Sequence, residues 1–524
     1  MDLTLQILIV GWIFVLIWVP FIFITNRKAH PSALFVLFGA EMWERFSYYG
    51  MRALLTLYMA RVLFESLGQT LADQNALAVY GSYTSMVYLF PVIGGLIADR
   101  VLGFRKTVIF GGILMMLGHF TLALAGIYME KNLIAFFMAL ALIIVGNGLF
   151  KPNISSFLGE FYDLDDPRKD GAFTIFYMGV NIGAFLATLT CGYVGEQINW
   201  HYGFGLAGIG MALGLIVFWL SGPRVFGAKG LVPASAKKAR NILGMRPAIF
   251  TYIATIVFVP ICSVFLNFDD LMSTLLIIIG LGVLGYMIYL GATEKNRADG
   301  ERLWVVSVLF VFHAVFWMLF EQAGGSLTLF TLRSVDRVVM GSEIPASIFQ
   351  SLNPLYIMLL APVFSWIWLK LRKSGKEPST PMKFVLGLTQ LGLGFAVIVV
   401  GAKMFASDSN LVPLIFLVLM YLLHTMGELS LSPVGLSMIT KLSPAKIVGF
   451  VMGAWFLSIA LANKLAGMVG ELTASKDLEN ATPQELLSNY SGTYLIWGVY
   501  VVLGAALILL LLVPRLRKWM NGIH

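Results

Sequence analysis

The 524-residue chain contains a long succession of apolar runs, each about long enough to cross the hydrocarbon core of a bilayer as a helix. A spanning helix needs about 20 predominantly apolar residues, and about fifteen runs approach that length. The expected spans are Leu5–Ile24, Ser32–Ala60, Ala76–Ala98, Thr107–Ile127, Leu133–Phe150, Ala172–Val194, Gly203–Trp219, Pro247–Leu266, Met272–Leu290, Trp304–Glu321, Ile348–Leu369, Lys383–Val400, Leu411–Leu431, Ile447–Val469 and Tyr494–Val513. This pattern predicts an all-α polytopic membrane protein.

The composition excludes a soluble protein. Hydrophobic residues make up 58% of the chain and charged residues 12%, whereas soluble proteins carry about 25% charged residues. A net charge of +8 would favour nucleic acid as the partner of a soluble chain, but here the basic residues lie in short loops. Cys191 and Cys262 lie far apart in apolar runs, so we expect neither a disulfide framework nor a zinc site.

The loop charges predict the orientation of the chain. Alternate loops carry roughly 26 Lys and Arg on one side and roughly 6 on the other, so the first side is cytoplasmic. Leu5–Ile24 is preceded only by Asp2 and lacks a basic segment and a small-residue cleavage site. We therefore expect a retained extra helix rather than a signal peptide. The N-terminus would lie outside and the C-terminus inside.

One run, Ser32–Ala60, carries charges that an isolated membrane helix would not tolerate. Glu41, Glu44, Arg45 and Arg52 would each cost roughly 2.5–3.5 kcal/mol at the centre of a bilayer. On a helix these residues and Tyr48 fall on one stripe about 100° wide. The stripe favours a helix that faces a water-filled pathway over a soluble amphipathic helix.

The order of the spans predicts two six-helix halves. A basic connector from about Ser221 to Arg246 and two further spans separate them. We expect an extra helix and loop at residues 1–31, an N-terminal bundle at 32–220, the connector with its two-helix insertion at 221–302, and a C-terminal bundle at 303–524. A cavity would lie between the halves. The loop Gly95-Leu96-Ile97-Ala98-Asp99-Arg100, with Gly103, Arg105 and Lys106, resembles the signature loop of the major facilitator superfamily.

Topology assigns similar depths to charges from opposite halves. Arg52 and Glu321 would both lie towards the outer side, and Lys151 and Glu428 both towards the cytoplasm. We interpret them as two gate pairs that alternately close the ends of one cavity. Protonation of a carboxylate would release its basic partner. The alternative, that the pairs only hold the halves together, is disfavoured because desolvated ion pairs rarely add net stability.

Three histidines, His119, His313 and His424, also lie in apolar runs. A lone histidine in a membrane helix is more typical of a hydrogen-bonded packing residue than of a proton carrier. His424 and Glu428 stand four residues apart, but no further ligand accompanies them, so we expect no metal.

Several motifs together resemble the proton-dependent oligopeptide transporter (peptide transporter, POT) family, within the major facilitator superfamily. The resemblance rests on Glu41-x-x-Glu44-Arg45-Phe46-x-Tyr48-Tyr49-Gly50, Phe150-Lys151-Pro152-Asn153, Tyr177-x-x-x-Asn181-Ile182-Gly183, Phe316-Trp317, Gln350-Ser351-Leu352-Asn353-Pro354 and Glu428-x-x-x-Ser432-Pro433-x-Gly435. It covers the chain from about Phe35 to Val513, and the two inserted helices match the prokaryotic members. The extra N-terminal helix departs from the family pattern, and its role stays open.

The resemblance implies a symporter in the cytoplasmic (inner) membrane of a prokaryote that imports di- and tripeptides with protons. Arg45 and Lys151 would bind the peptide carboxylate, whereas Glu428, helped by Asn181 and Asn353, would bind its amino terminus. Ser432 belongs to the same motif as Glu428. The proton-coupling residues would be Glu41, Glu44, Arg45 and Glu321. Aromatic walls tolerant of many side chains would come from Tyr48, Tyr49, Tyr88, Tyr177, Trp317, Phe320 and Trp455.

The resemblance implies no cofactor: protons are the coupling ion, membrane lipid surrounds the protein, and nucleic acid is not a partner. A relative with another substrate, such as longer peptides, nitrate or peptide-like compounds, stays an alternative. A membrane-embedded enzyme is a remote one, because the sequence holds no His-Glu-x-x-His and no Gly-x-Ser-x-Gly.

Overall fold

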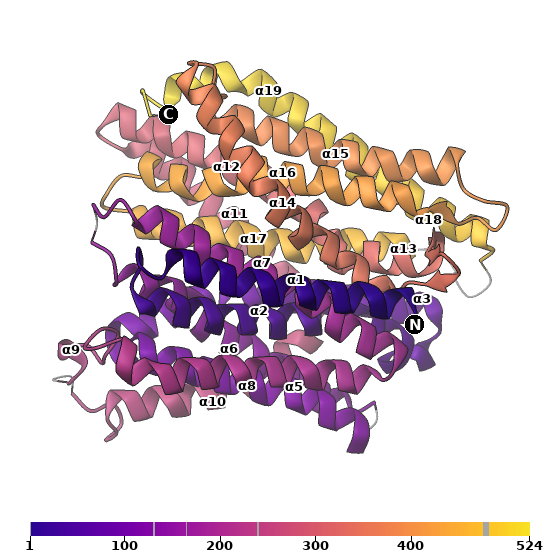
Figure 1. Ribbon diagram of the computed structural model, residues 1–524. Coiled ribbons are helices and arrows are strands. Elements are labelled where there is room, and N and C mark those ends of the chain that lie inside the picture. The colour runs from indigo at the N-terminus through magenta and orange to yellow at the C-terminus, as the bar shows by residue number, and fades with distance from the viewer. Residues whose placement is uncertain (1, 129–130, 164, 238–239, 475–480, 524) are drawn as a thin grey trace. The chain divides into compact units, whose positions relative to one another are not determined.

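The computed structural model describes residues 2–128, 131–163, 165–237, 240–474 and 481–523, and these ranges are built from helices (Figure 1). The α-helices are α1 (Leu3–Asn26), α2 (Ser32–Tyr58), α3 (Gln69–Leu89), α4 (Pro91–Ile97), α5 (Phe104–Tyr128), α6 (Leu133–Gly159), α7 (Lys169–Gln197), α8 (Trp200–Val225), α9 (Ala234–Lys237), α10 (Pro247–Asn267), α11 (Asp269–Thr293), α12 (Arg297–Phe320), α13 (Ser326–Ser334), α14 (Leu352–Lys373), α15 (Thr380–Met404), α16 (Leu414–Leu442), α17 (Val448–Glu471), α18 (Pro483–Thr493) and α19 (Val502–Trp519). The predicted all-α polytopic class is confirmed.

Fourteen helical segments of the described chain are long and apolar enough to cross a membrane. They correspond to the predicted runs with one exception, Ser32–Ala60. That run forms α2, which is 27 residues long and therefore of sufficient length. Its charged residues make α2 too polar to be recognised as a span by composition. The helix therefore depends on the helices around it to shield those charges.

The ends of several helices extend beyond the apolar runs. The run Ala76–Ala98 belongs to a longer helical segment, Gln69–Leu102, made of α3, α4 and the π-helical turn η3 (Ala98–Leu102). Pro91 begins α4 because proline lacks the N–H that would continue the preceding helix. Polar residues such as Gln69 and Asp73 extend α3 at its other end, and hydropathy alone does not register them.

The chain forms two compact units by its internal contacts. The first contains Met1–Tyr58, Met86–Phe268 and Val338–Pro354, and the second contains Met59–Ser85, Asp269–Arg337 and Leu355–His524. This division does not test the domain boundaries expected from the sequence, which stay predictions. Of the two inserted helices, α10 packs on α6 in the first unit, and α11 packs on α12 and α17 in the second.

Helices within each unit pack through apolar faces. In the first unit α2 packs against α7 and α8, and α5 packs against α6 and α8. The extra helix α1 lies along α7 (Figure 1), where the Trp12 Nε1 donates a hydrogen bond of 3.0 Å to the Thr190 Oγ1. In the second unit α15 packs against α16 and α19, and α12 packs against α17.

Short strands occur only in connections between the helices of the described chain. In the second unit β1 (Val335–Asp336) pairs in parallel with β4 (Val412–Pro413), with Val335 opposite Val412. In the first unit β2 (Val338–Val339) and β3 (Ser342–Glu343) form an antiparallel hairpin. Met340 and Gly341 both have positive φ, 51° and 80°, as a two-residue hairpin turn requires.

Close approach of α2 and α7 depends on glycine. A Cβ at Gly183 of α7 would lie 2.2 Å from the backbone oxygen of Met42 and 3.0 Å from the Cβ of Arg45. A side chain at this position would therefore push α7 away from the charged face of α2. The small residue sets the distance at which the two helices pack.

We predict that Gly183→Ala destabilises the protein by about 1–3 kcal/mol, the usual cost of overpacking a tight interface. Thermal unfolding in detergent, followed by tryptophan fluorescence, would show a lower midpoint. The matched control is Gly282→Ala in α11, where an added Cβ meets nothing within 4 Å. There alanine should be neutral or stabilising, since glycine is the poorer helix former. Equal midpoints for the two variants would contradict this packing argument.

Candidate functional site

The charged stripe of α2 forms a buried ion cluster in the first unit. The Arg45 Nε lies 2.8 Å from the Glu41 Oε1 and 2.6 Å from the Glu44 Oε2. Glu41 is 4% exposed, Glu44 0% and Arg45 2%. One guanidinium is thus shared between two carboxylates one helical turn or less away, and this part of the stripe is buried.

A polar residue of α6 completes the cluster. The Asn147 Nδ2 donates a hydrogen bond of 2.9 Å to the Glu44 Oε1, and Asn147 is itself fully buried. The Nη2 of Arg45 donates no hydrogen bond within the described ranges, although it is buried. A buried guanidinium with a spare donor is suited to a second anion, because a carboxylate can accept from two of its nitrogens. Asn147 is not among the residues predicted from the sequence, although an asparagine within an apolar run is a usable signal.

Aromatic rings line the cationic groups of the first unit. The Arg45 guanidinium lies 5.8 Å from the centroid of the Tyr48 ring, and that of Arg52 lies 5.7 Å from the Tyr49 ring. The Lys151 Nζ of α6 lies 4.3 Å from the centroid of the Tyr88 ring of α3. Each distance is within the range of cation–π attraction. Three of the predicted wall residues, Tyr48, Tyr49 and Tyr88, are therefore held against predicted charges.

The remaining predicted residues of the first unit lie on α7 and α14. The Asn181 Nδ2 donates a 3.0 Å hydrogen bond to the backbone oxygen of Tyr177, four residues earlier on α7. Asn181 is buried and Tyr177 is 46% exposed. Asn353 follows the first residue of α14.

In the second unit a histidine connects two predicted wall residues. The Trp317 Nε1 donates a 2.8 Å hydrogen bond to the His313 Nε2, and the His313 Nδ1 lies 2.7 Å from the Ser458 Oγ. The imidazole stacks on Trp455, with ring centroids 4.0 Å apart.

The bonds of this network assign the tautomer of the imidazole. Since indole can only donate, the Nε2 must accept, and Nδ1 carries the proton that it donates to Ser458. The Ser458 Oγ in turn donates to the backbone oxygen of Trp455 at 2.7 Å. His313 is thus a hydrogen-bonded residue that fixes two tryptophans, as expected of a packing histidine. His119 differs, because neither of its ring nitrogens has a partner in the described chain.

The other predicted residues of the second unit lie at the end of α12, in the turn that follows it, and on α16. Phe320 ends α12, its ring 5.1 Å from Trp317, and the buried Glu321 begins the 3₁₀ turn η4 (Glu321–Gly324). Glu428 lies on α16 and is 8% exposed. Ser432 is on the same helix, but its side chain lies outside the described residues. Both proposed gate pairs, Arg52–Glu321 and Lys151–Glu428, combine residues of different units and stay predictions.

The run Ile447–Val469 also contains a buried lysine that is not among the residues predicted from the sequence. Lys464 of α17 is completely buried and pairs with Asp269, the first residue of α11, and its Nζ lies 3.1 Å from the Ser82 Oγ of α3. A lysine inside an apolar run was the available signal. Its partner was not predictable, because Asp269 lies 195 residues away in what reads as an ordinary acidic turn.

Comparison with known proteins identifies the family of this chain. The model of the POT family matches residues 105–486. A peptide transporter of Yersinia enterocolitica subsp. palearctica is 39% identical over 506 residues, which cover 94% of this chain and 96% of that protein. Dipeptide and tripeptide permease A of Edwardsiella piscicida is 32% identical over 498 residues, covering 95% and 97%.

Solved structures of transporters also match this chain over most of its length. A peptide transporter POT variant in complex with alafosfalin matches with a TM-score of 0.79 and 40% identity, covering 94% of this chain and 96% of that one. A POT family transporter in complex with 5-aminolevulinic acid matches with a TM-score of 0.78 and 31% identity, covering 93% and 97%. The chain therefore belongs to the POT family and is a transporter, not an enzyme.

Proposed function

We propose that this integral membrane protein is a proton-coupled symporter that imports di- and tripeptides by alternating access. The observation that carries the proposal is the buried Glu41–Arg45–Glu44 cluster with its spare guanidinium donor. Membership of the POT family and the names of the relatives, among them a dipeptide and tripeptide permease, support the substrate class. The expected location is the cytoplasmic membrane of a prokaryote, with the N-terminus outside and the C-terminus inside.

The cationic end of the site would bind the peptide carboxylate. Arg45 offers the Nη2 that has no partner in the described chain, and Lys151 is held against the Tyr88 ring. Glu428, Asn181, Asn353 and Ser432 would bind the peptide amino terminus. A zwitterionic peptide needs opposite charges across a fixed gap and little specificity between them. The aromatic walls named above suit that need, because a ring accepts varied side chains by contact area.

The coupling step would use competition for Arg45. With both carboxylates ionised, the guanidinium is occupied by Glu41 and Glu44. Protonation of one carboxylate removes its charge, so the guanidinium becomes more available to the incoming peptide carboxylate. Glu321 would couple protonation to the outer gate with Arg52, and Lys151 with Glu428 would form the inner gate. We expect the domains at 1–31, 32–220, 221–302 and 303–524.

Some family members bind compounds other than ordinary peptides. The matching structures hold alafosfalin in one case and 5-aminolevulinic acid in another. Both are candidate competitors for the proposed site. Uptake of labelled dialanine into proteoliposomes with an imposed inward proton gradient tests the function directly. Uptake that ignores the gradient would contradict coupling, and failure of every di- and tripeptide to be taken up or to compete would contradict the substrate class.

We predict that Lys151→Ala raises the half-saturating dialanine concentration roughly 10- to 100-fold, the cost of losing one charge-assisted contact. Initial uptake rates across a concentration series in proteoliposomes measure it. Lys446→Ala, at an exposed position after α16, is the matched control and should behave like the parent protein. An unchanged half-saturation in Lys151→Ala would remove this residue from the substrate site.

We predict that Glu44→Gln separates binding from coupling. The amide keeps the shape of the side chain but cannot be protonated, so gradient-driven accumulation should fall to the level seen without a gradient. Exchange of labelled for unlabelled peptide across the membrane should continue, since that exchange needs no net proton movement. The control is Glu294→Gln in the exposed connection between α11 and α12. Full accumulation by Glu44→Gln would show that this carboxylate does not couple.

We predict that His313→Ala changes side-chain preference and leaves coupling intact. Loss of its hydrogen bond to Trp317 and its stacking on Trp455 should weaken uptake of peptides with aromatic side chains roughly fivefold relative to dialanine. The ratio of half-saturation constants for the two peptides measures this effect. His119→Ala, at a buried histidine of α5 in the first unit, serves as the control. Loss of the gradient dependence in His313→Ala would instead identify a proton carrier.

A further inference from the structure

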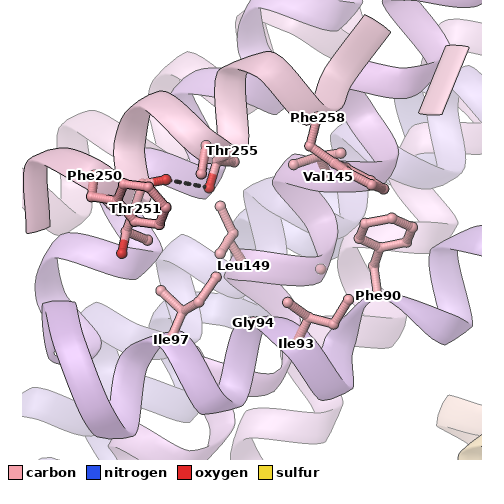
Figure 2. Close-up of a pocket in the computed structure, with 12 residues that line it drawn as sticks. Phe90, Ile93, Gly94, Ile97, Val145, Leu149, Phe250, Thr251, Thr255 and Phe258 are labelled. Atoms are coloured by element: carbon pink, nitrogen blue, oxygen red, sulfur yellow. Dashed lines mark hydrogen bonds between the residues drawn. The ribbon is translucent and has the colours of Figure 1, made fainter. Parts of the chain in front are cut away.

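A cavity of about 300 Å³ lies between α4, α6 and α10 of the first unit (Figure 2). All three helices belong to segments that are long and apolar enough to span a membrane. The lining is almost entirely hydrocarbon and consists of Phe90, Ile93, Gly94, Ile97, Val145, Gly148, Leu149, Phe250, Thr251, Ala254, Thr255 and Phe258. None of these residues belongs to the proposed peptide site. Ile93 is 50% exposed, so the cavity opens at the side of the bundle.

The two polar side chains of the lining have their hydrogen bonds satisfied within α10. The Thr251 Oγ1 donates to the backbone oxygen of Pro247 at 2.9 Å, and the Thr255 Oγ1 donates to that of Thr251 at 2.8 Å (Figure 2). Neither hydroxyl needs a partner from a ligand. The cavity therefore suits a wholly apolar occupant.

One end of the lining is aromatic, and the other lies near basic residues. The Phe90 and Phe258 rings pack 5.3 Å apart at the aromatic end. A Cβ at Gly94 would lie 1.9 Å from the Gly148 oxygen, so α4 and α6 meet closely there and close the floor. From Phe250 to Phe258 the wall formed by α10 is about 12 Å long.

The end lined by Ile97 and Phe250 lies about one helical turn from two exposed arginines. Arg246 immediately precedes α10, four residues before Phe250, and Arg100 in η3 follows Ile97 by three residues. Helix α10 packs against η3. Asp99 is also exposed beside Arg100, and the local balance of these three groups is positive. An apolar cavity that ends at a basic rim is complementary to a molecule with a hydrocarbon tail and an anionic head.

We propose that this cavity binds one acyl chain of an anionic phospholipid, whose phosphate lies against Arg100 and Arg246. Hydrocarbon alone gives no preference for the cavity over the surrounding bilayer, because lipid tails are as apolar as the lining. Selectivity for an anionic headgroup therefore comes from the two arginines. They act on lipids of the leaflet on their own side of the membrane. The bound chain fills the space between α10 and the α4–α6 pair, and so stabilises the packing of the inserted helix on the first unit.

Native mass spectrometry of the full-length protein tests the proposal. The protein is purified in detergent with equal amounts of phosphatidylglycerol and phosphatidylcholine, and the retained lipids are counted. We expect preferential retention of phosphatidylglycerol. Ala254 lines the cavity and is exposed. Ala254→Trp should therefore fill the cavity and remove one bound phosphatidylglycerol. Ile256→Trp, on the outward face of the same helix and 56% exposed, should retain it and is the matched control.

The arginines are tested separately, since both are exposed. Arg100→Gln and Arg246→Gln should each weaken phosphatidylglycerol binding roughly fivefold and leave phosphatidylcholine unchanged. Arg224→Gln, an exposed arginine at the end of α8, should have no such effect. Equal retention of the two lipids by the parent protein, an equal loss in Arg224→Gln, or unchanged retention in Ala254→Trp would each overturn the proposal.

Discussion

The sharing of Arg45 between Glu41 and Glu44 is the interaction on which the α2 side of the first unit depends. Three ionised groups within one apolar helix are unfavourable in hydrocarbon, at roughly 2.5–3.5 kcal/mol each. Their pairing at 2.6–2.8 Å, with the amide of Asn147, makes burial tolerable. For the same reason α2 needs neighbours on its charged face, and Gly183 allows α7 to approach it closely.

In the proposed mechanism the same cluster would serve transport. Two carboxylates share one guanidinium, so when both are ionised the buried cluster carries a net negative charge and is sensitive to any proton or anion that arrives. A fully compensated pair would be more stable and less responsive. In this protein the cluster lies within about one helical turn, so in the proposed mechanism proton and substrate would act on the same guanidinium.

The sequence predicts those features that depend on one helix at a time. Apolar runs locate the spans, and helical periodicity places Glu41, Glu44 and Arg45 on one stripe, because both signals are local. The Asn147 bond to Glu44 and the pairing of Lys464 with Asp269 join helices far apart in the chain. Such contacts depend on how helices rotate and pack, which periodicity does not specify. The motif resemblance supplies candidate roles without supplying these contacts, and the gate pairs stay predictions for the same reason.

The His313 network suggests how a site can accept many side chains while keeping its shape. Tolerance by flexibility would require each peptide to order the walls anew, at an entropic cost to binding. Here Trp317 is fixed by a hydrogen bond to His313, and Trp455 by stacking on the same imidazole. Rigid rings offer area without requiring a particular partner. If these tryptophans line the peptide site, low specificity follows from the apolar nature of the rings, and affinity is preserved because the walls are already ordered.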